Sequence, residues 1–215
     1  MTNRNILRFF VAVLLMTASV TFSQEAETIK LLPPRMDHNT TLLQALQNRS
    51  SSRAFSGEKL PLQTLSNLLW SACGVNRPES GKRTAPSANN KQEVEDYVFL
   101  SDGVYLYDAQ AHELKLLLKE DLRSKTGKQE FVAQAPVNFV YIADLRKRGG
   151  EQKEKEFYSS VDTGFISQNV YLCCAAEGLA TVARGSVDRP ALEQFLKLRP
   201  DQFITLAQTI GYPQK

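Results

Sequence analysis

Hydrophobic residues recur along the chain at two spacings, and each spacing predicts one kind of secondary structure. Near the start, leucines and alanines fall three or four positions apart, which is typical of amphipathic helices. The first predicted helix covers residues 41–47. The second begins at Pro61, a residue that suits the first turn of a helix, and it stops at Gly74.

The spacing changes after a polar stretch at 76–91 that has no periodic pattern. A turn at Asp102-Gly103 between two β-prone runs predicts an antiparallel hairpin. The run at 137–143 is almost wholly apolar, as expected of a strand in the middle of a sheet. The predicted strands before it lie at 97–100, 104–107 and 114–118.

The second half of the chain is dominated by a long helical pattern at 151–177 that ends at Gly178. Strands and helices are therefore mixed, and we expect one α+β domain. The remaining predicted elements are short helices at 129–134 and 189–198 and strands at 179–183 and 203–210.

The first 23 residues resemble a secretory signal peptide. Arg4 and Arg8 precede an apolar stretch at 9–20, and small residues stand just before Gln24. We expect cleavage there, an N-terminal arm at 24–39, a domain at 40–215, and export to the periplasm or the medium. The alternative is a retained anchor, although the apolar stretch is shorter than the roughly 20 residues that span a bilayer.

Composition narrows the class of protein. Hydrophobic residues are 42% and charged residues 23% of the chain, which favours a packed globular domain over disorder. The formal charge is only +3, and the leader carries two of the positive side chains. A general nucleic-acid surface or anionic-membrane surface is therefore not expected.

Cysteine and histidine offer no catalytic or metal-binding pattern. Cys73, Cys173 and Cys174 are an odd number without metal-ligand spacing, so we expect free buried thiols, with a disulfide of Cys73 as the open alternative. His38 and His112 are expected at the surface. No nucleophile or zinc-protease motif is present in the sequence.

Two polar segments carry the candidate chemistry. Arg49 to Arg53 places two guanidinium groups and three hydroxyls just after the first helix, a set of donors that suits one phosphate group. The segment 83–92 gathers amides and hydroxyls, which can donate and accept at the edge of a pyrimidine-like ring. Each segment taken alone also fits an ordinary solvated loop.

A third segment, 178–188, contains Gly185, which lets the backbone approach a flat ligand closely. In this order the segments resemble the nitroreductase family of oxidoreductases that use flavin mononucleotide (FMN), over nearly all of residues 40–213. The matching residues are Arg49, Ser51 and Arg53; Pro86, Ser87, Ala88, Asn90 and Gln92; Gln168, Asn169, Gly178, Leu179 and Thr181; and Gly211, Tyr212 and Pro213.

The resemblance implies a central antiparallel or mixed sheet flanked by helices, with the long helix at a homodimer interface. It implies that Arg49 and Ser51 contact the phosphate or ribityl chain, that Arg53 approaches the pyrimidine edge, and that a backbone N–H at Gly185 meets flavin N5. Asn90 is expected near the flavin, across the subunit boundary. The other expected contacts are Ser50, Pro86, Ser87, Ala88, Gln92, Arg184 and Lys215.

The chain departs from the family pattern in three places. Lys91 replaces a small or apolar residue, Glu93-Val94 stands where relatives have Pro-Trp, and only Lys215 remains of a basic tail. The hairpin at 103–114 resembles that of the branch that includes azoline-oxidising peptide dehydrogenases.

The expected activity is hydride transfer through flavin N5 between a donor such as NAD(P)H and an organic acceptor. In such a site the flavin carries the chemistry, so no catalytic side chain is required. Outside the cytoplasm we expect either that a different donor serves or that the substrate is oxidised directly, as in the dehydrogenase branch. The expected substrate is a small molecule or is derived from a peptide. The alternatives are a non-catalytic exported module that binds flavin or another planar ligand, and an unrelated α+β domain.

Overall fold

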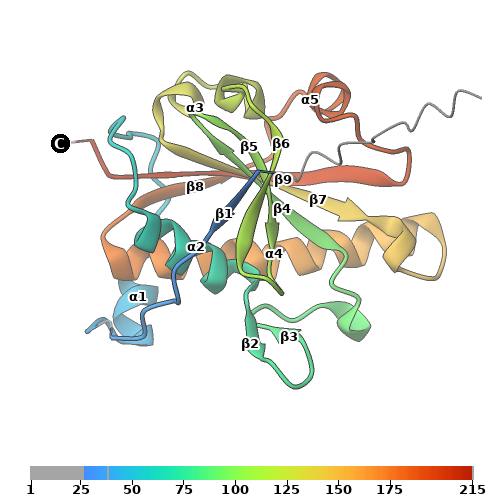
Figure 1. Ribbon diagram of the computed structural model, residues 1–215, viewed down its shortest axis with the longest axis horizontal. Helices are drawn as coiled ribbons and strands as arrows, with labels where there is room; N and C mark the ends of the chain where they lie inside the picture. The colour runs from blue at the N-terminus through green and yellow to red at the C-terminus, as the bar shows by residue number, and fades with distance from the viewer. Residues whose placement is uncertain (1–26, 38, 215) are drawn as a thin grey trace, which may run out of the picture.

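The computed structural model describes residues 27–37 and 39–214 (Figure 1). The predicted leader at 1–23, His38 and Lys215 lie outside the described residues. Within the described part, no helix is long and apolar enough to cross a membrane.

One sheet of seven strands forms the centre of the domain, in the order β1-β6-β5-β4-β7-β9-β8, and every neighbouring pair is antiparallel. This selects the antiparallel form of the predicted sheet. A separate hairpin, β2–β3, lies outside it. The strands are β1 Thr28–Lys30, β2 Val75–Arg77, β3 Lys82–Arg83, β4 Val94–Leu100, β5 Gly103–Asp108, β6 Glu113–Leu118, β7 Val137–Asp144, β8 Ala180–Arg184 and β9 Gln202–Gly211.

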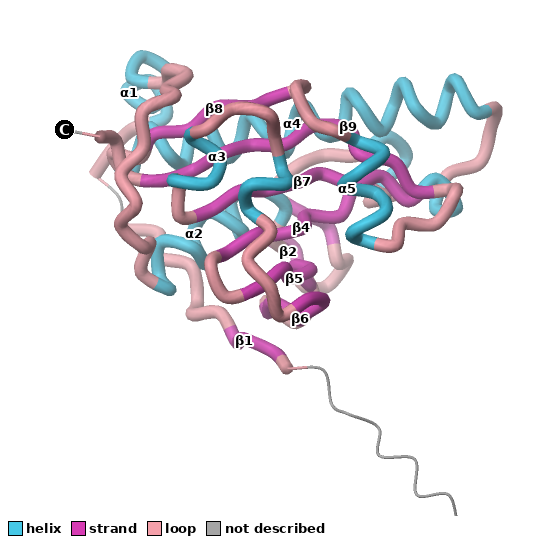
Figure 2. The backbone as a smooth tube through the Cα atoms, turned by 90° about the horizontal axis from the view of Figure 1, so that it is seen from above, coloured by secondary structure: helices cyan, strands magenta, loops and turns pink. Residues whose placement is uncertain are grey.

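Helices cover both faces of the sheet. Figures 1 and 2 show α3 and α5 on one side and α1, α2 and the long α4 on the other. The predicted α+β architecture, with helices flanking a sheet, is thereby confirmed. The helices are α1 Leu42–Asn48, α2 Leu62–Cys73, α3 Phe131–Gln134, α4 Gln152–Glu177 and α5 Arg189–Leu196.

The position of β7 in the middle of the sheet explains why its sequence is almost wholly apolar. Phe139 and Tyr141 pack in the core toward α2 and α4, whereas Val140 and Ile142 pack in the core on the α5 side. All four are fully buried, and burying each large apolar side chain contributes about 1.5–3 kcal/mol. A strand buried on both faces cannot alternate apolar and polar residues.

The long helix matches its prediction almost to the residue. Glu151 precedes its first turn, and Gly178 ends it with φ +69°, the left-handed region that glycine occupies without a Cβ penalty. The first helix begins with a capping box between Thr41 and Gln44, in which each side chain bonds the other's backbone N–H.

Three strands were missed because they are too short to carry a period. Strand β1 lies in the predicted arm and pairs Ile29 with Leu114 at the sheet edge. Strands β2 and β3 lie in the stretch predicted to be a loop.

His112 is half-buried rather than on the surface, because its ring nitrogens bond the Tyr107 hydroxyl at 2.9 Å and the Ser66 hydroxyl at 2.8 Å.

Candidate functional site

The segment 49–53 leaves α1 and runs along β8. Arg49 donates its N–H to the last turn of α1, and the N–H of Ser52 donates to the carbonyl of Thr181 at 2.9 Å. The hydroxyl of Ser51 lies 2.9 Å from the hydroxyl of Tyr171 on α4. The segment is therefore held between the edge strand of the sheet and the long helix.

Tyr171 organises this side of the site, although no motif marked it. Its hydroxyl accepts the N–H of Ala183 at 2.9 Å, and the guanidinium of Arg49 lies 5.5 Å from the centre of its ring. A guanidinium over an aromatic face is held by cation–π attraction of about 0.5–1 kcal/mol at exposed sites. Tyr171 thus orients Arg49 without neutralising its charge.

The cations of this segment remain available. Among the described residues, neither Arg49 nor Arg53 has a carboxylate partner, and Ser50 and Arg53 are exposed. Arg49 and the Ser51 hydroxyl can therefore donate to an anion. This donor set fits the phosphate of a cofactor such as FMN.

The second predicted segment is a tight loop. Ala88–Asn90 form the 3₁₀ turn η1, and Asn89, Asn90 and Gln92 have φ values of +55°, +53° and +50°. The N–H of Gln92 donates to the Ser87 hydroxyl at 2.9 Å, and its side-chain amide donates to Oδ1 of Asn90 at 3.1 Å. Ser87 and Gln92 therefore stabilise the loop itself, while Pro86 and Asn90 are exposed.

The two segments lie on opposite flanks of α4. Asp162 accepts the N–H of Ala88 in the loop, whereas Tyr171, nine positions further, contacts Ser51. Nine residues of helix correspond to about 13.5 Å and two and a half turns, so the two side chains leave the helix in opposite directions. Five hollows in the described part of one chain are lined by neither Arg49 nor Asn90.

An exposed apolar stripe runs along α4 between these flanks. Phe157, Val161 and Phe165, at helical spacing, are 62%, 38% and 46% exposed, and Gly164 beside them has open space where a Cβ would stand. Contiguous exposed apolar surface of this kind is typical of an interaction face. The leucines exposed on neighbouring α1 are Leu42, Leu43 and Leu46.

In the third segment, 178–188, the backbone at Gly185 is exposed whereas the side chain of Arg184 is buried. The Arg184 side chain points into the protein, where its guanidinium donates to the carbonyl of Thr126 at 2.8 Å and the hydroxyl of Thr209 at 2.9 Å. Burial lowers the pKa of Arg184 to about 10. The structure thus places this side chain away from the other predicted residues, whereas Gly185 is exposed with nothing within 4 Å of a Cβ position.

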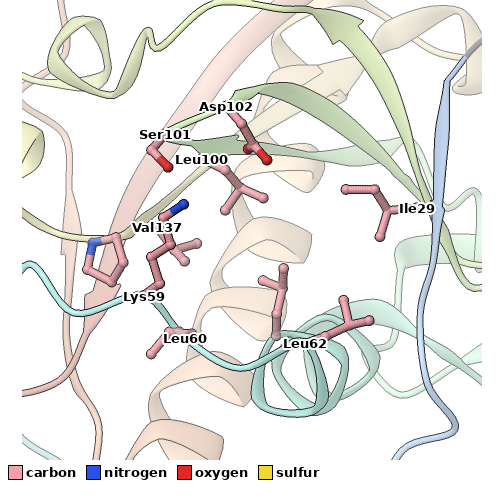
Figure 3. Close-up of a pocket in the computed structure, with 10 residues that line it drawn as sticks. Ile29, Lys59, Leu60, Leu62, Leu100, Ser101, Asp102 and Val137 are labelled. Atoms are coloured by element: carbon pink, nitrogen blue, oxygen red, sulfur yellow. The ribbon is translucent and has the colours of Figure 1, made fainter.

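None of five hollows in the described part of the chain is lined by residues of the segment 49–53. An apolar hollow of about 180 Å³ lies between β1, the start of α2 and the β4–β5 turn, with Lys59, Ser101 and Asp102 as its polar residues (Figure 3). A much narrower one lies beside the loop and is lined by Ser87, Gln92 and Asp162 among others.

Metal and disulfide chemistry are absent from the described residues. No group of side chains there could hold a metal ion, and all three cysteines are free, so the alternative of a Cys73 disulfide is not realised. The Cys73 thiol donates to Asp96 at 3.0 Å, and burial raises the pKa of both groups, that of Asp96 to about 6.

The chain is similar to known proteins over most of its length. A curated protein of Methanocaldococcus jannaschii named as a nitroreductase is 31% identical over 165 residues, which cover 72% of this chain and 83% of that protein. A crystal structure from Ralstonia eutropha JMP134, also named as a nitroreductase, is 40% identical with a TM-score of 0.83, covering 87% of this chain and 90% of that one.

A structure of the E. coli microcin synthetase complex with truncated pro-MccB17 bound shares the fold, with a TM-score of 0.66 and 18% identity over 97% of this chain and 85% of that one. The model of the Nitroreductase family matches residues 46–212, which is most of the sequence. The chain belongs to the nitroreductase family.

Proposed function

We propose that this protein is an exported FMN-dependent oxidoreductase that moves hydride between a donor such as NAD(P)H and an organic acceptor. The observation that carries the proposal is the membership of the nitroreductase family together with the free guanidinium of Arg49 and the hydroxyl of Ser51 beside an exposed helix face. When bound, FMN supplies the hydride-accepting N5 atom.

In this proposal Arg49 and Ser51 bind the phosphate. Arg49 offers a fork of N–H donors and a full charge, and Ser51 adds a short hydroxyl donor. Tyr171 holds both groups in place through the contacts described above. Arg53 places a second positive charge on the same segment.

In the same proposal, Gly185 and Asn90 contact the flavin ring. The exposed backbone of Gly185 lets a flat ring approach the protein closely, and a side chain at this position would occupy that space. The amide of Asn90 donates and accepts, which suits the polar edge of a pyrimidine ring.

We further propose a homodimer in which each site draws on two chains. The apolar stripes of two α4 helices, with Phe157, Val161 and Phe165, would bury one another. Such packing brings the Arg49 flank of one chain to the Asn90 flank of its partner. A shared site of this kind accounts for why the two flanks are separated within a single chain.

The test uses the chain from residue 24 onward, expressed and purified. The proposal predicts a yellow dimer with a flavin absorbance band that bleaches in stopped flow with NADPH or another added donor. A yellow protein that exchanges electrons with no donor and no acceptor would favour the non-catalytic binding module. Export is checked separately, by locating the protein in cell fractions with and without residues 1–23.

A further inference from the structure

Three charged side chains outside the predicted contact set meet beneath the loop 86–92. Glu93 follows the loop directly, Arg148 follows the turn η3 (Leu145–Lys147), and Asp162 lies on α4. Nη1 of Arg148 is 2.9 Å from Oε1 of Glu93 and 3.3 Å from Oδ2 of Asp162. Their side chains are only 5%, 0% and 2% exposed for Arg148, Glu93 and Asp162.

The cluster carries one positive group for two carboxyls. The hydroxyl of Ser159 donates to Oε1 of Glu93 at 3.0 Å, but Oε2 of Glu93 has no hydrogen-bond partner among the described residues. A second buried negative charge without a partner is strongly disfavoured. Accordingly, burial and the neighbouring Glu93 raise the pKa of Asp162 to about 6, against the opposing effect of the Ala88 N–H.

This cluster holds the backbone of the loop. Both carboxyl oxygens of Asp162 accept the N–H of Ala88, at 3.0 and 3.2 Å, and Nη1 of Arg148 lies 3.5 Å from the carbonyl of Ala88. Directly after Ala88 come Asn89 and Asn90 in left-handed conformations, which non-glycine residues rarely adopt. A strained turn of this kind persists only where its surroundings hold it.

We propose that Arg148, Glu93 and Asp162 form an anchor that sets the conformation of the loop 86–92, positions Asn90 for the cofactor, and holds most firmly in mildly acidic solution. These are positioning residues, since they act through the loop backbone. The cofactor part of this inference rests on the proposed function; the loop part does not.

The direction of the pH effect follows from the groups around Asp162. Glu93 and Arg148 face it within the cluster, and Cys73 and Arg83 line the same narrow hollow from α2 and β3. Burial and Glu93 raise the pKa of Asp162 to about 6, so the closed cluster holds this proton more tightly than a solvated carboxyl does. Below about pH 6 the protonated Asp162 leaves one carboxylate for one guanidinium, and the anchor is most stable. As the pH rises through 6 the second buried negative charge appears and the hold on the loop weakens.

The direct test is hydrogen exchange of the backbone at 84–93 in flavin-free protein. At pH 7.5, Arg148→Met and Asp162→Ala, which remove the guanidinium and the acceptor of the Ala88 N–H, should raise exchange in this segment at least about fivefold. The matched control is Arg146→Met, because Arg146 is 57% exposed and pairs with Asp144 rather than with the loop. Unchanged exchange in both anchor variants overturns the proposal.

A milder variant covers the case in which Arg148→Met does not fold. Glu93→Gln keeps the shape and leaves one carboxylate for one guanidinium. Loop exchange, corrected for the intrinsic effect of pH, should then change at a lower pH than in the wild type, where the midpoint is expected near 6. An unshifted midpoint contradicts the anchor.

The cofactor readout is titration with FMN followed by quenching of flavin fluorescence. The dissociation constant should rise about fivefold or more in Arg148→Met, and Arg148→Lys should recover part of the loss. Unchanged affinity in Arg148→Met contradicts the positioning role. If the wild type binds no FMN, the proposed function fails, while the exchange result still decides the anchor.

Discussion

The two flanks of α4 hold their loops by different physics. On the Tyr171 flank, the segment 49–53 is held by neutral hydrogen bonds and one cation–π contact, and its cations stay unpaired. On the Asp162 flank, the loop 86–92 is held by a buried cluster of one guanidinium and two carboxyls. A segment that binds an anion needs positive side chains without carboxylate partners. A loop that contributes amide side chains can instead be held by buried ion pairs.

The largest expected effect comes from the surface between the flanks. Phe165→Glu places a charge in the middle of the proposed dimer contact, where burial of an unpaired carboxylate is prohibitive. We expect a monomer that has lost nearly all FMN, measured by sedimentation and by flavin absorbance. Lys155→Glu, a half-buried position near the start of the same helix, is the control. A dimer that keeps its flavin despite Phe165→Glu would rule out this contact.

Removing the free cation should have the next largest effect. Arg49→Ala deletes a charge-assisted donor to phosphate, so FMN affinity should fall about tenfold to a hundredfold. Arg146→Ala removes an exposed guanidinium on another part of the surface and should leave affinity unchanged. The comparison is made by fluorescence titration, and equal affinities for the two variants would contradict the phosphate assignment.

A buried carboxyl away from both flanks should respond to pH in the same direction as the anchor. Burial raises the pKa of Asp96 to about 6, so the folded state holds this proton more tightly than the unfolded chain. The stability from this group is present near pH 4 and is lost as pH rises through 6. Asp96→Asn should therefore raise the free energy of unfolding at pH 8 by about 1–2 kcal/mol.

Urea unfolding at pH 4 and pH 8 measures this difference. At pH 4 the variant and the wild type should agree closely, because Asp96 is then protonated in the folded protein. A variant that is less stable than the wild type at pH 8 would show that the ionised carboxyl contributes net stability.

The smallest effect is expected at Tyr171. Tyr171→Phe keeps the ring beneath Arg49 but removes the hydroxyl that bonds Ser51 and Ala183. The loss of such neutral bonds is about 0.5–1.5 kcal/mol, so FMN affinity should fall no more than about tenfold. The effect should be the same at pH 5.5 and 7.5, unlike that of Asp162→Ala, which should be larger at pH 5.5. A loss of FMN affinity in Tyr171→Phe that depends on pH would contradict the statement that neutral hydrogen bonds hold the segment 49–53.

Much of the fold was predictable because its main elements are long and regular. The helix α4 and the strand β7 each carry a pattern that only one structure satisfies. The strand β1 and the hairpin β2–β3 were missed because two or three residues have no measurable period. Their formation depends on a partner strand rather than on their own sequence.

Only the residues of the candidate site that belong to a local motif could be predicted from the sequence. Arg49 and Ser51 follow the end of α1 as expected, and Arg49 has no carboxylate partner among the described residues. Tyr171, Arg148 and Asp162 could not be found, because their importance arises from which loops pack against them. Arg184 was assigned to the cofactor from its place in the motif, but its strand turns the side chain inward to bond Thr126 and Thr209.

The central claim is that one cofactor site uses Arg49 of one chain and Asn90 of the other, and mixed dimers test it most directly. Arg49→Ala and Asn90→Asp chains with different tags are each expected to retain little FMN. In a mixed dimer the account predicts that one of the two sites is wholly wild type, so flavin content should recover to about half that of the wild-type dimer. Mixed dimers as poor in flavin as either parent would place both residues in the same chain's site and contradict the account.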